Sequence, residues 1–183
     1  MKRLLQSLPA LLILLTVYSC GVNFNIVSDK ENDINFDKYK SFAIIHDDHG
    51  FEKGANPINK QRIDRAIENE FREMGYVDSE NSDLQISWFI KVDTKLEHGI
   101  YNAYYSRWRY PRTIEVYQYQ VGSLVIDIVD ASTGQVVWHA KASSKVYDDM
   151  PDVENKIKKV VREMVKSYKK DTGIKKINRY VFK

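Results

Sequence analysis

The sequence predicts an α+β fold: a two-layer sandwich in which a mainly antiparallel sheet of about five strands carries two helices packed on one face. Apolar residues recur every three or four positions in two segments, as in helices with a single buried face. Elsewhere apolar and polar residues alternate, as in strands with one face in the core and the other in water. The predicted order of strand, helix, four strands and helix places both helices in one covering layer.

Composition indicates one exported domain that folds without disulfides. The chain has 183 residues, a formal net charge of +3 and a single cysteine. This length fits one domain with a core of its own, and the near-neutral charge gives no reason to expect nucleic acid as a partner. We divide the chain into a signal peptide (1–19), a lipidated N-terminus and tether with a short strand (20–38), a single α+β domain (39–170) and a basic C-terminal tail (171–183).

The first twenty residues have the order of a bacterial lipoprotein export signal. Two basic residues precede the apolar stretch from Leu4 to Val17, and small Ser19 precedes Cys20. About 14 apolar residues are too few to span a bilayer, which needs ~20. The alternatives are an ordinary secretory signal with an incidental cysteine, or an uncleaved anchor. We expect Cys20 to carry lipid, such as palmitate chains, that holds the protein to the membrane.

The residue after the cysteine refines the expected location. It is Gly21 rather than an acidic residue, and residues 22–26 carry no charge. By analogy with lipoprotein sorting, no inner-membrane retention signal and no acidic surface-export signal is evident. We therefore expect an outer-membrane lipid anchor that faces the periplasm.

The first strand and helix have recognisable ends. A buried strand is predicted from Tyr39 to Ile45, with a turn at 46–50. The helix begins with Asn56 as cap and Pro57 in the first position, and ends at Gly75. We expect its charged residues to occupy the solvent faces, including Glu68, Glu70 and Glu73, and its buried stripe to be Ile63, Ala66, Ile67, Phe71 and Met74.

A long central strand and a hairpin follow. After Asp83, apolar residues alternate from Leu84 to Val92 on the predicted core face, and only Phe89 breaks the pattern. Another strand region covers 114–130, turns at 131–134 and returns through 135–140.

The last helix is predicted to begin at Asp149–Asp152, with Asp149 as cap and Pro151 in the first turn, and to end at Gly173. Its other faces and the tail are basic, which suits either a solvated surface or contact with anionic lipid. Its inward residues are Val153, Ile157, Val160, Val161, Met164, Val165 and Tyr168.

Several of these segments together suggest a family. They are the cysteine of the export signal, Phe36–Ala43, Asn56–Ile63, Met74–Tyr76, Ser82–Leu84, Gly122–Asp130 and the pairs Thr133-Gly134 and Val137-Trp138. In these segments the chain resembles the lipoprotein family catalogued as domain of unknown function 4136, over about residues 22–168. The shared motifs are structural: the start of a strand, a helix cap and an Asp-x-x-Thr-Gly hairpin before a buried Trp. The resemblance implies a bacterial cell-envelope lipoprotein and supplies neither an activity nor active-site residues.

An aromatic segment between the strands is the main candidate binding surface. Flat rings beside guanidinium groups suit stacking on sugars or contact with lipid headgroups. The alternatives are a structural cover at one end of the sheet, binding of a glycan or peptide, and contact with membrane or protein. The candidate binding residues are Tyr101, Tyr104, Tyr105, Arg107, Trp108, Arg109 and Tyr110.

Signals for chemistry are weaker. His46, Asp48 and His49 offer metal-ligating groups, although a solvated turn uses the same residue types, so we assign no metal site and no cofactor. No Gly-x-Ser-x-Gly elbow, His-Glu-x-x-His helix or phosphate-binding glycine loop occurs, so we assign no catalytic residue.

The sequence thus predicts a lipid-anchored envelope protein of unknown biochemical activity, a non-enzymatic binding or structural module in the periplasm whose partner is an envelope protein or glycan. The alternatives are a metal-dependent or hydrolytic envelope enzyme and an accessory subunit of an outer-membrane assembly.

Overall fold

The computed structural model describes residues 24–46, 56–100, 114–146 and 152–174, and it confirms the α+β class. The sheet has six strands rather than about five, in the order β1-β6-β5-β4-β2-β3. Its strands are β1 (Asn25–Lys30), β2 (Ser41–Ile44), β3 (Val77–Asp78), β4 (Leu84–Ile100), β5 (Ile114–Asp130) and β6 (Val136–Val146). The helices are α3 (Pro57–Met74) and α4 (Val153–Thr172), and a short 3-10 turn, Phe36–Lys38, precedes β2.

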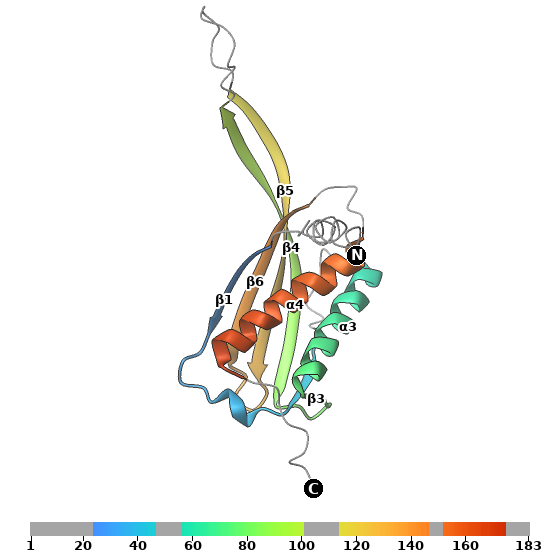
Figure 1. The fold of residues 1–183 in the computed structure, drawn as a ribbon, viewed down its shortest axis with the longest axis vertical. Helices are drawn as coiled ribbons and strands as arrows, with labels where there is room; N and C mark the ends of the chain where they lie inside the picture. Colours follow the sequence, from blue (N-terminus) through green and yellow to red (C-terminus); the bar gives the residue numbers. More distant parts are fainter. Residues whose placement is uncertain (1–23, 47–55, 101–113, 147–151, 175–183) are drawn as a thin grey trace, which may run out of the picture.

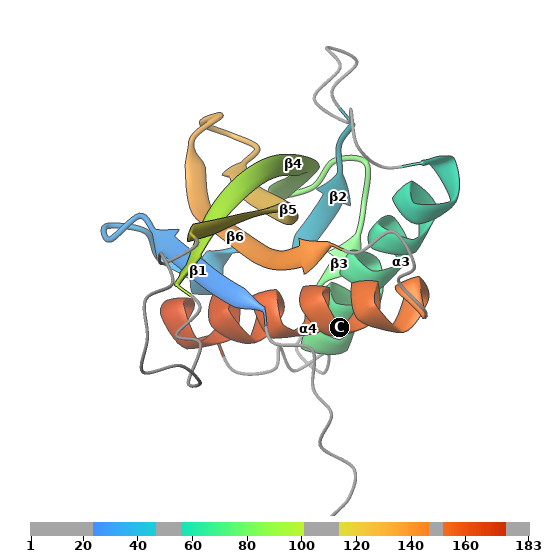
Figure 2. The same cartoon turned by 90° about the horizontal axis from the view of Figure 1, so that it is seen from above.

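The two helices lie side by side on one face of the sheet, as predicted (Figures 1 and 2). Strands β1, β6, β5 and β4 are antiparallel neighbours, whereas β2 runs parallel to both β4 and β3. The two-residue strand β3, which the sequence pattern did not predict, forms the edge beyond β2. Among the described residues, no helix is long and apolar enough to cross a membrane.

Helix α3 has the ends that the sequence predicts. The Asn56 side chain accepts a hydrogen bond from the Asn59 backbone N–H at 2.8 Å, and Gly75 leaves the helix in a left-handed conformation with φ of 101°. All five residues of the expected apolar stripe are buried. Glu70 is an exception to the expected solvent face, because it is only 8% exposed and pairs with Arg162 of α4.

Helix α4 begins later than predicted. Asp152 precedes its first residue and has a φ of 58°, a left-handed conformation that cannot belong to the helix itself. Asp149, expected as the cap, and Pro151, expected in the first turn, both lie outside the described residues. The Asp152 carboxylate instead accepts hydrogen bonds from the Asn155 side chain. The far end is as expected, with Gly173 at φ of 71°.

Aromatic side chains fill the core between the layers. Tyr168 of α4 packs edge-on against Trp138 of β6, with ring centroids 5.3 Å apart, and its ring centroid lies 5.7 Å from that of Phe71. The hydroxyl groups of Tyr168 and Tyr76 are hydrogen-bonded at 3.1 Å. Asp171, in the last turn of α4, accepts hydrogen bonds from Ser28 of β1 and the indole N–H of Trp138, so it fastens the helix to two strands.

Candidate interaction site

The most distinctive feature of the fold is a two-stranded arm. Strands β4 and β5 stay paired from Leu84–Asp130 as far as Ile100–Ile114. Strand β6 pairs with β5 only as far as Gln120, so residues 95–100 and 114–119 form a ribbon of two strands, here called the arm. Figure 1 shows it leaving the body of the molecule. Six residues in each strand give the arm a length of about 20 Å.

The edge of β4 that faces away from β5 is open over most of its length. Strand β2 pairs with β4 only at Leu84, Gln85 and Ile86, and beyond Ile86 no other described strand covers this edge. Its side chains are mixed in character. Lys91 and Asp93 form an ion pair at 3.0 Å, whereas Val92 and Leu96 are 51% and 63% exposed. Val92 was expected on the core face; the helix layer leaves it half in solvent.

An apolar groove lies at the base of the arm, between the first turns of α3 and α4 and the sheet. Its volume is about 270 Å³. Gly122 of β5 forms part of its wall, and a Cβ atom there would lie 2.6 Å from Val146 Cγ2, so the site favours a glycine. Most of the lining is apolar: Phe24, Ile63, Ile90, Val92, Leu124, Ala142, Val146, Val153, Ile157 and Val160.

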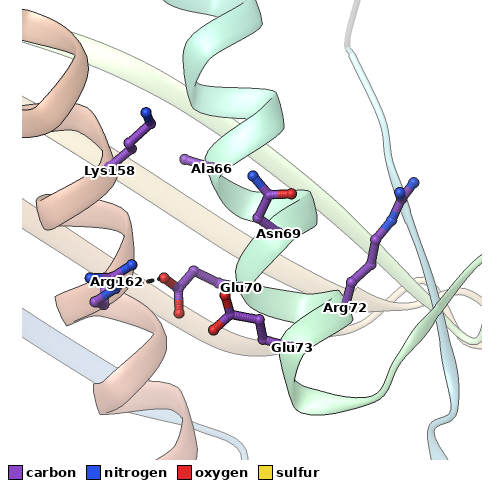
Figure 3. Close-up of a pocket in the computed structure, with 7 residues that line it drawn as sticks. All are labelled: Ala66, Asn69, Glu70, Arg72, Glu73, Lys158 and Arg162. Atoms are coloured by element: carbon purple, nitrogen blue, oxygen red, sulfur yellow. Dashed lines mark hydrogen bonds and ion pairs between the residues drawn. The ribbon is translucent and has the colours of Figure 1, made fainter.

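A second groove, of about 340 Å³, runs between the two helices and is charged (Figure 3). The Arg162 Nε donates a hydrogen bond to Glu70 Oε1 at 2.9 Å, and this pair raises the pKa of Arg162. Glu73 and Lys158 also line the groove. Two carboxylates of α3, Glu70 and Glu73, line the groove with three cations, Arg72, Lys158 and Arg162. Most of its charge is therefore balanced within the groove, which suits a contact that holds α3 against α4 rather than a site for a charged ligand.

The Asp-x-x-Thr-Gly hairpin is held by a buried carboxylate. Asp130 accepts hydrogen bonds from the Ser132 hydroxyl at 2.5 Å, from Lys38 Nζ at 2.9 Å and from the Tyr39 hydroxyl at 2.8 Å. The bonds from Ser132 and Lys38 hold the pKa of Asp130 well below its usual range. Every partner stabilises the ionised carboxylate, so this cluster anchors the β5–β6 turn to the chain before β2.

The predicted histidine turn is only partly described. His46 Nε2 lies 3.5 Å from Asp64 Oδ2. The other carboxylate oxygen of Asp64, Oδ1, accepts a hydrogen bond from Trp88 Nε1 at 2.7 Å. Asp48 and His49, the other two candidate ligands, lie outside the described residues. Within the described segments, no three His, Cys, Asp or Glu side chains come together as a metal site.

The remaining predicted site residues also lie outside the described residues: Cys20, and Tyr101, Tyr104, Tyr105, Arg107, Trp108, Arg109 and Tyr110 of the aromatic segment. The structure nevertheless fixes the two ends of that segment, because residues 101–113 join Ile100 to Ile114. Sequence reasoning missed the arm, although the extended polar and apolar alternation from Lys91 to Glu97 was a visible signal for it.

Solved structures with a similar fold come from two bacteria. A PDZ domain protein from Parabacteroides distasonis matches with a TM-score of 0.55 and 18% identity, over 90% of this chain. This chain spans only 39% of that protein. PelC of Paraburkholderia phytofirmans, solved as a dodecamer, matches with a TM-score of 0.50 and 10% identity, over 85% of this chain and 100% of that one. At these identities the likeness concerns the fold alone.

Comparison of sequences gives the family. No curated protein matches the chain significantly. A family described as "Domain of unknown function (DUF4136)" matches residues 26–168, which include every strand and helix of the sandwich except the first residue of β1 and the last turn of α4. The chain therefore belongs to the DUF4136 family.

Proposed function

We propose that this chain is a lipid-anchored protein of the bacterial cell envelope that acts by binding another envelope component. Cys20 would carry the lipid, and the aromatic segment, residues 101–110, would make the contact. The proposal places the protein on the outer membrane, facing the periplasm. The single observation that carries it is the arm, which presents both ends of the aromatic segment about 20 Å beyond the last residues of β6.

The composition of the aromatic segment supports a binding role at the end of the arm. It contains four tyrosines, one tryptophan and two arginines among its candidate residues. Such side chains bury large surfaces with little loss of conformational freedom, and guanidinium groups stack on rings or bind carboxylates and phosphates. A segment that served only to cover the body would have no need of an arm that leaves it.

Lipidation is tested by metabolic labelling of the full-length protein with a palmitate analogue, followed by membrane fractionation. We expect label and membrane association in wild type, and loss of both in Cys20→Ser. An unlabelled wild-type protein in the soluble fraction would refute the anchor.

Binding is tested by affinity purification from native membranes with mild crosslinking. The test variant is the triple Tyr104→Ala, Tyr105→Ala, Trp108→Ala. The matched control removes three exposed apolar side chains from the body, Val27, Val77 and Val136, each replaced by Ala. We expect one glycan or envelope protein to be recovered with wild type and the control, and lost with the test variant. Equal recovery with all three proteins would exclude the aromatic segment as the contact.

A second candidate is a structural subunit of an outer-membrane assembly. The open edge of β4 favours it, because an unpaired strand is a template for pairing with another chain. PelC, which has a similar fold, is a dodecamer. Size measurement of the detergent-extracted protein tests this candidate: an assembly larger than a dimer would support the structural subunit, whereas a monomer or dimer would not.

A further inference from the structure

We propose that the open edge of β4 pairs with the same edge of a second copy of this chain, antiparallel and with a two-fold axis at Thr94. The result is one continuous sheet across two molecules. This inference goes beyond the proposed function, because it requires neither lipid on Cys20 nor any residue of the aromatic segment. It rests on strand geometry and on the order of side chains from Lys91 to Glu97.

Proteins usually keep unpaired edge strands short, whereas the open edge of β4 is long. From Ile90 to Ile100 it has no partner strand in the described part of the chain, whereas strands usually number five or six residues. Proteins commonly blunt such edges with prolines, bulges or charged side chains, most often lysine. The described pairing of β4 with β5 shows no bulge, and residues 87–100 contain no proline. The charges of this edge alternate in sign, which attracts a copy of itself.

The sequence along the edge is self-complementary about Thr94. In an antiparallel pair with this centre, residues equally far from Thr94 on either side lie opposite one another. Asp93 then lies opposite Lys95 of the other copy, and Lys91 lies opposite position 97, a glutamate. Symmetry repeats each pair, so every charged residue from 91 to 97 gains an opposite charge. Opposite charges directly across a strand pair are stabilising.

Neighbouring registers lack this property. A two-fold axis at Asp93 places Asp93 against itself and Lys91 against Lys95, and an axis at Lys95 places that lysine against itself. An axis at Val92 matches Lys91 with Asp93 but sets Phe89 against Lys95. An axis at Leu96 likewise matches Lys95 with position 97 but sets Asp93 against Gly99. Of these registers, only the one at Thr94 gives all four charged positions an opposite charge, and like charges penalise a shift of one residue in either direction.

The apolar side chains agree with the charges. Val92 and Leu96 are among the most exposed large apolar residues of the described chain, at 51% and 63%. In the proposed register they lie opposite one another on the same face of the sheet, once on each side of the axis. The pairing thus covers apolar surface that the monomer leaves in water.

The first test reverses one charge in each of two otherwise wild-type chains. Alone, Lys95→Glu sets Glu against Asp93, and Asp93→Lys sets Lys against Lys95, so each variant is expected to self-associate about tenfold more weakly than wild type. Mixed, the two variants restore both attractive pairs and should form a heterodimer. The full-length proteins are purified in mild detergent, and their masses are measured by sedimentation, separately and together. A monomeric wild type, unaltered self-association of both variants, or no heterodimer on mixing would each overturn the proposal.

The second test locates the axis. Thr94→Cys places a thiol opposite its own copy, at the Cβ separation of cross-strand neighbours, and should give a disulfide-linked dimer under mild oxidation. The matched control is Gln120→Cys, the exposed β5 residue paired with Thr94, which lies one strand away from the open edge. Wild type, whose only cysteine is Cys20, gives the background. Equal crosslinking at positions 94 and 120 would overturn the register. The same dimer in the Tyr104, Tyr105 and Trp108 triple variant shows that self-pairing and partner binding are separate properties.

Discussion

The Tyr39 hydroxyl donates a hydrogen bond to Asp130 Oδ2 at 2.8 Å, which joins the chain just before β2 to the last residue of β5 across ninety-one positions of sequence. Both side chains are buried, and Lys38 Nζ meets the same carboxylate oxygen at 2.9 Å. The other carboxylate oxygen receives the Ser132 hydroxyl and the backbone N–H groups of Ser132 and Thr133. One carboxylate therefore closes both the hairpin and the loop that leads into β2.

We expect Asp130→Ala to lower the free energy of unfolding by about 2–4 kcal/mol, because it leaves the buried Tyr39 hydroxyl, the donors of the turn and the Lys38 cation without their acceptor. Asp127→Ala, on the same strand, removes only an exposed pair with His139 and should cost less than about 1 kcal/mol. Urea denaturation of the two variants and wild type measures both. Equal losses would show that the burial of Asp130 contributes nothing special.

The same carboxylate predicts acid sensitivity. The folded-state pKa of Asp130 is lowered, so its stabilising effect is complete above its unfolded pKa near 4 and is lost as the pH falls towards the lower folded value. We expect the free energy of unfolding of wild type to fall below about pH 4 more steeply than that of Asp130→Asn, which cannot ionise. Parallel pH profiles would contradict this assignment.

The buried tyrosine pair predicts a loss of stability in alkali. Burial raises the pKa of Tyr76 to about 12, and burial raises the pKa of Tyr168 well above its usual value. A raised folded pKa stabilises the fold below the unfolded value of 10, and this contribution is lost as the pH rises towards 12. Tyrosinate absorbance should show Tyr76 and Tyr168 among the last tyrosines to titrate, and the double variant Tyr76→Phe, Tyr168→Phe should be less sensitive to alkali than wild type. Titration of both hydroxyls with the exposed tyrosines would contradict the assignment.

The close approach of Gly122 to Val146 predicts that a second substitution restores stability lost through the first. Gly122→Ala places a methyl group 2.6 Å from Val146 Cγ2, and we expect it to cost about 1–3 kcal/mol through overpacking. Adding Val146→Ala removes the obstructing methyl groups, so the double variant should recover most of that loss. Thermal unfolding of the two single variants and the double variant forms the complete cycle. Additive losses would show that the two side chains do not meet.

Periodic apolar patterns predicted much of the fold. The stripe of α3, the inward residues of α4 from Val160 to Tyr168 and the β5–β6 hairpin appear where the pattern places them. These predictions succeed because one-sided burial leaves a local signal at every third, fourth or second residue.

Features that depend on distant partners were not predictable from local pattern. Glu70 looks like a solvent residue until Arg162, ninety-two positions away, supplies its ion pair. The two-residue strand β3 forms because β2 lies beside it, and Val77 shows no pattern of its own. The first turn of α4 was misplaced because Asp149 and Asp152 both resemble caps, and only the left-handed φ of Asp152 shows where the helix begins.

The position at which β1 begins in the sheet limits how an anchored molecule can be oriented on a membrane. Asn25 pairs with Ser143, Ser143 with Ser123, and Ser123 with Lys91. Strand β1 therefore begins at the level of Lys91, near the base of the arm. The five-residue step from the lipid proposed at Cys20 to Asn25 reaches at most about 18 Å. The arm side extends about 30 Å from Lys91 to Ile100, and the opposite side about 24 Å from Ser143 to Val136. Both sides of the sheet are longer than the step of about 18 Å, so the strands of an anchored molecule cannot be perpendicular to the bilayer with either end of the sheet towards it. The strands would instead be inclined towards the plane of the lipid surface.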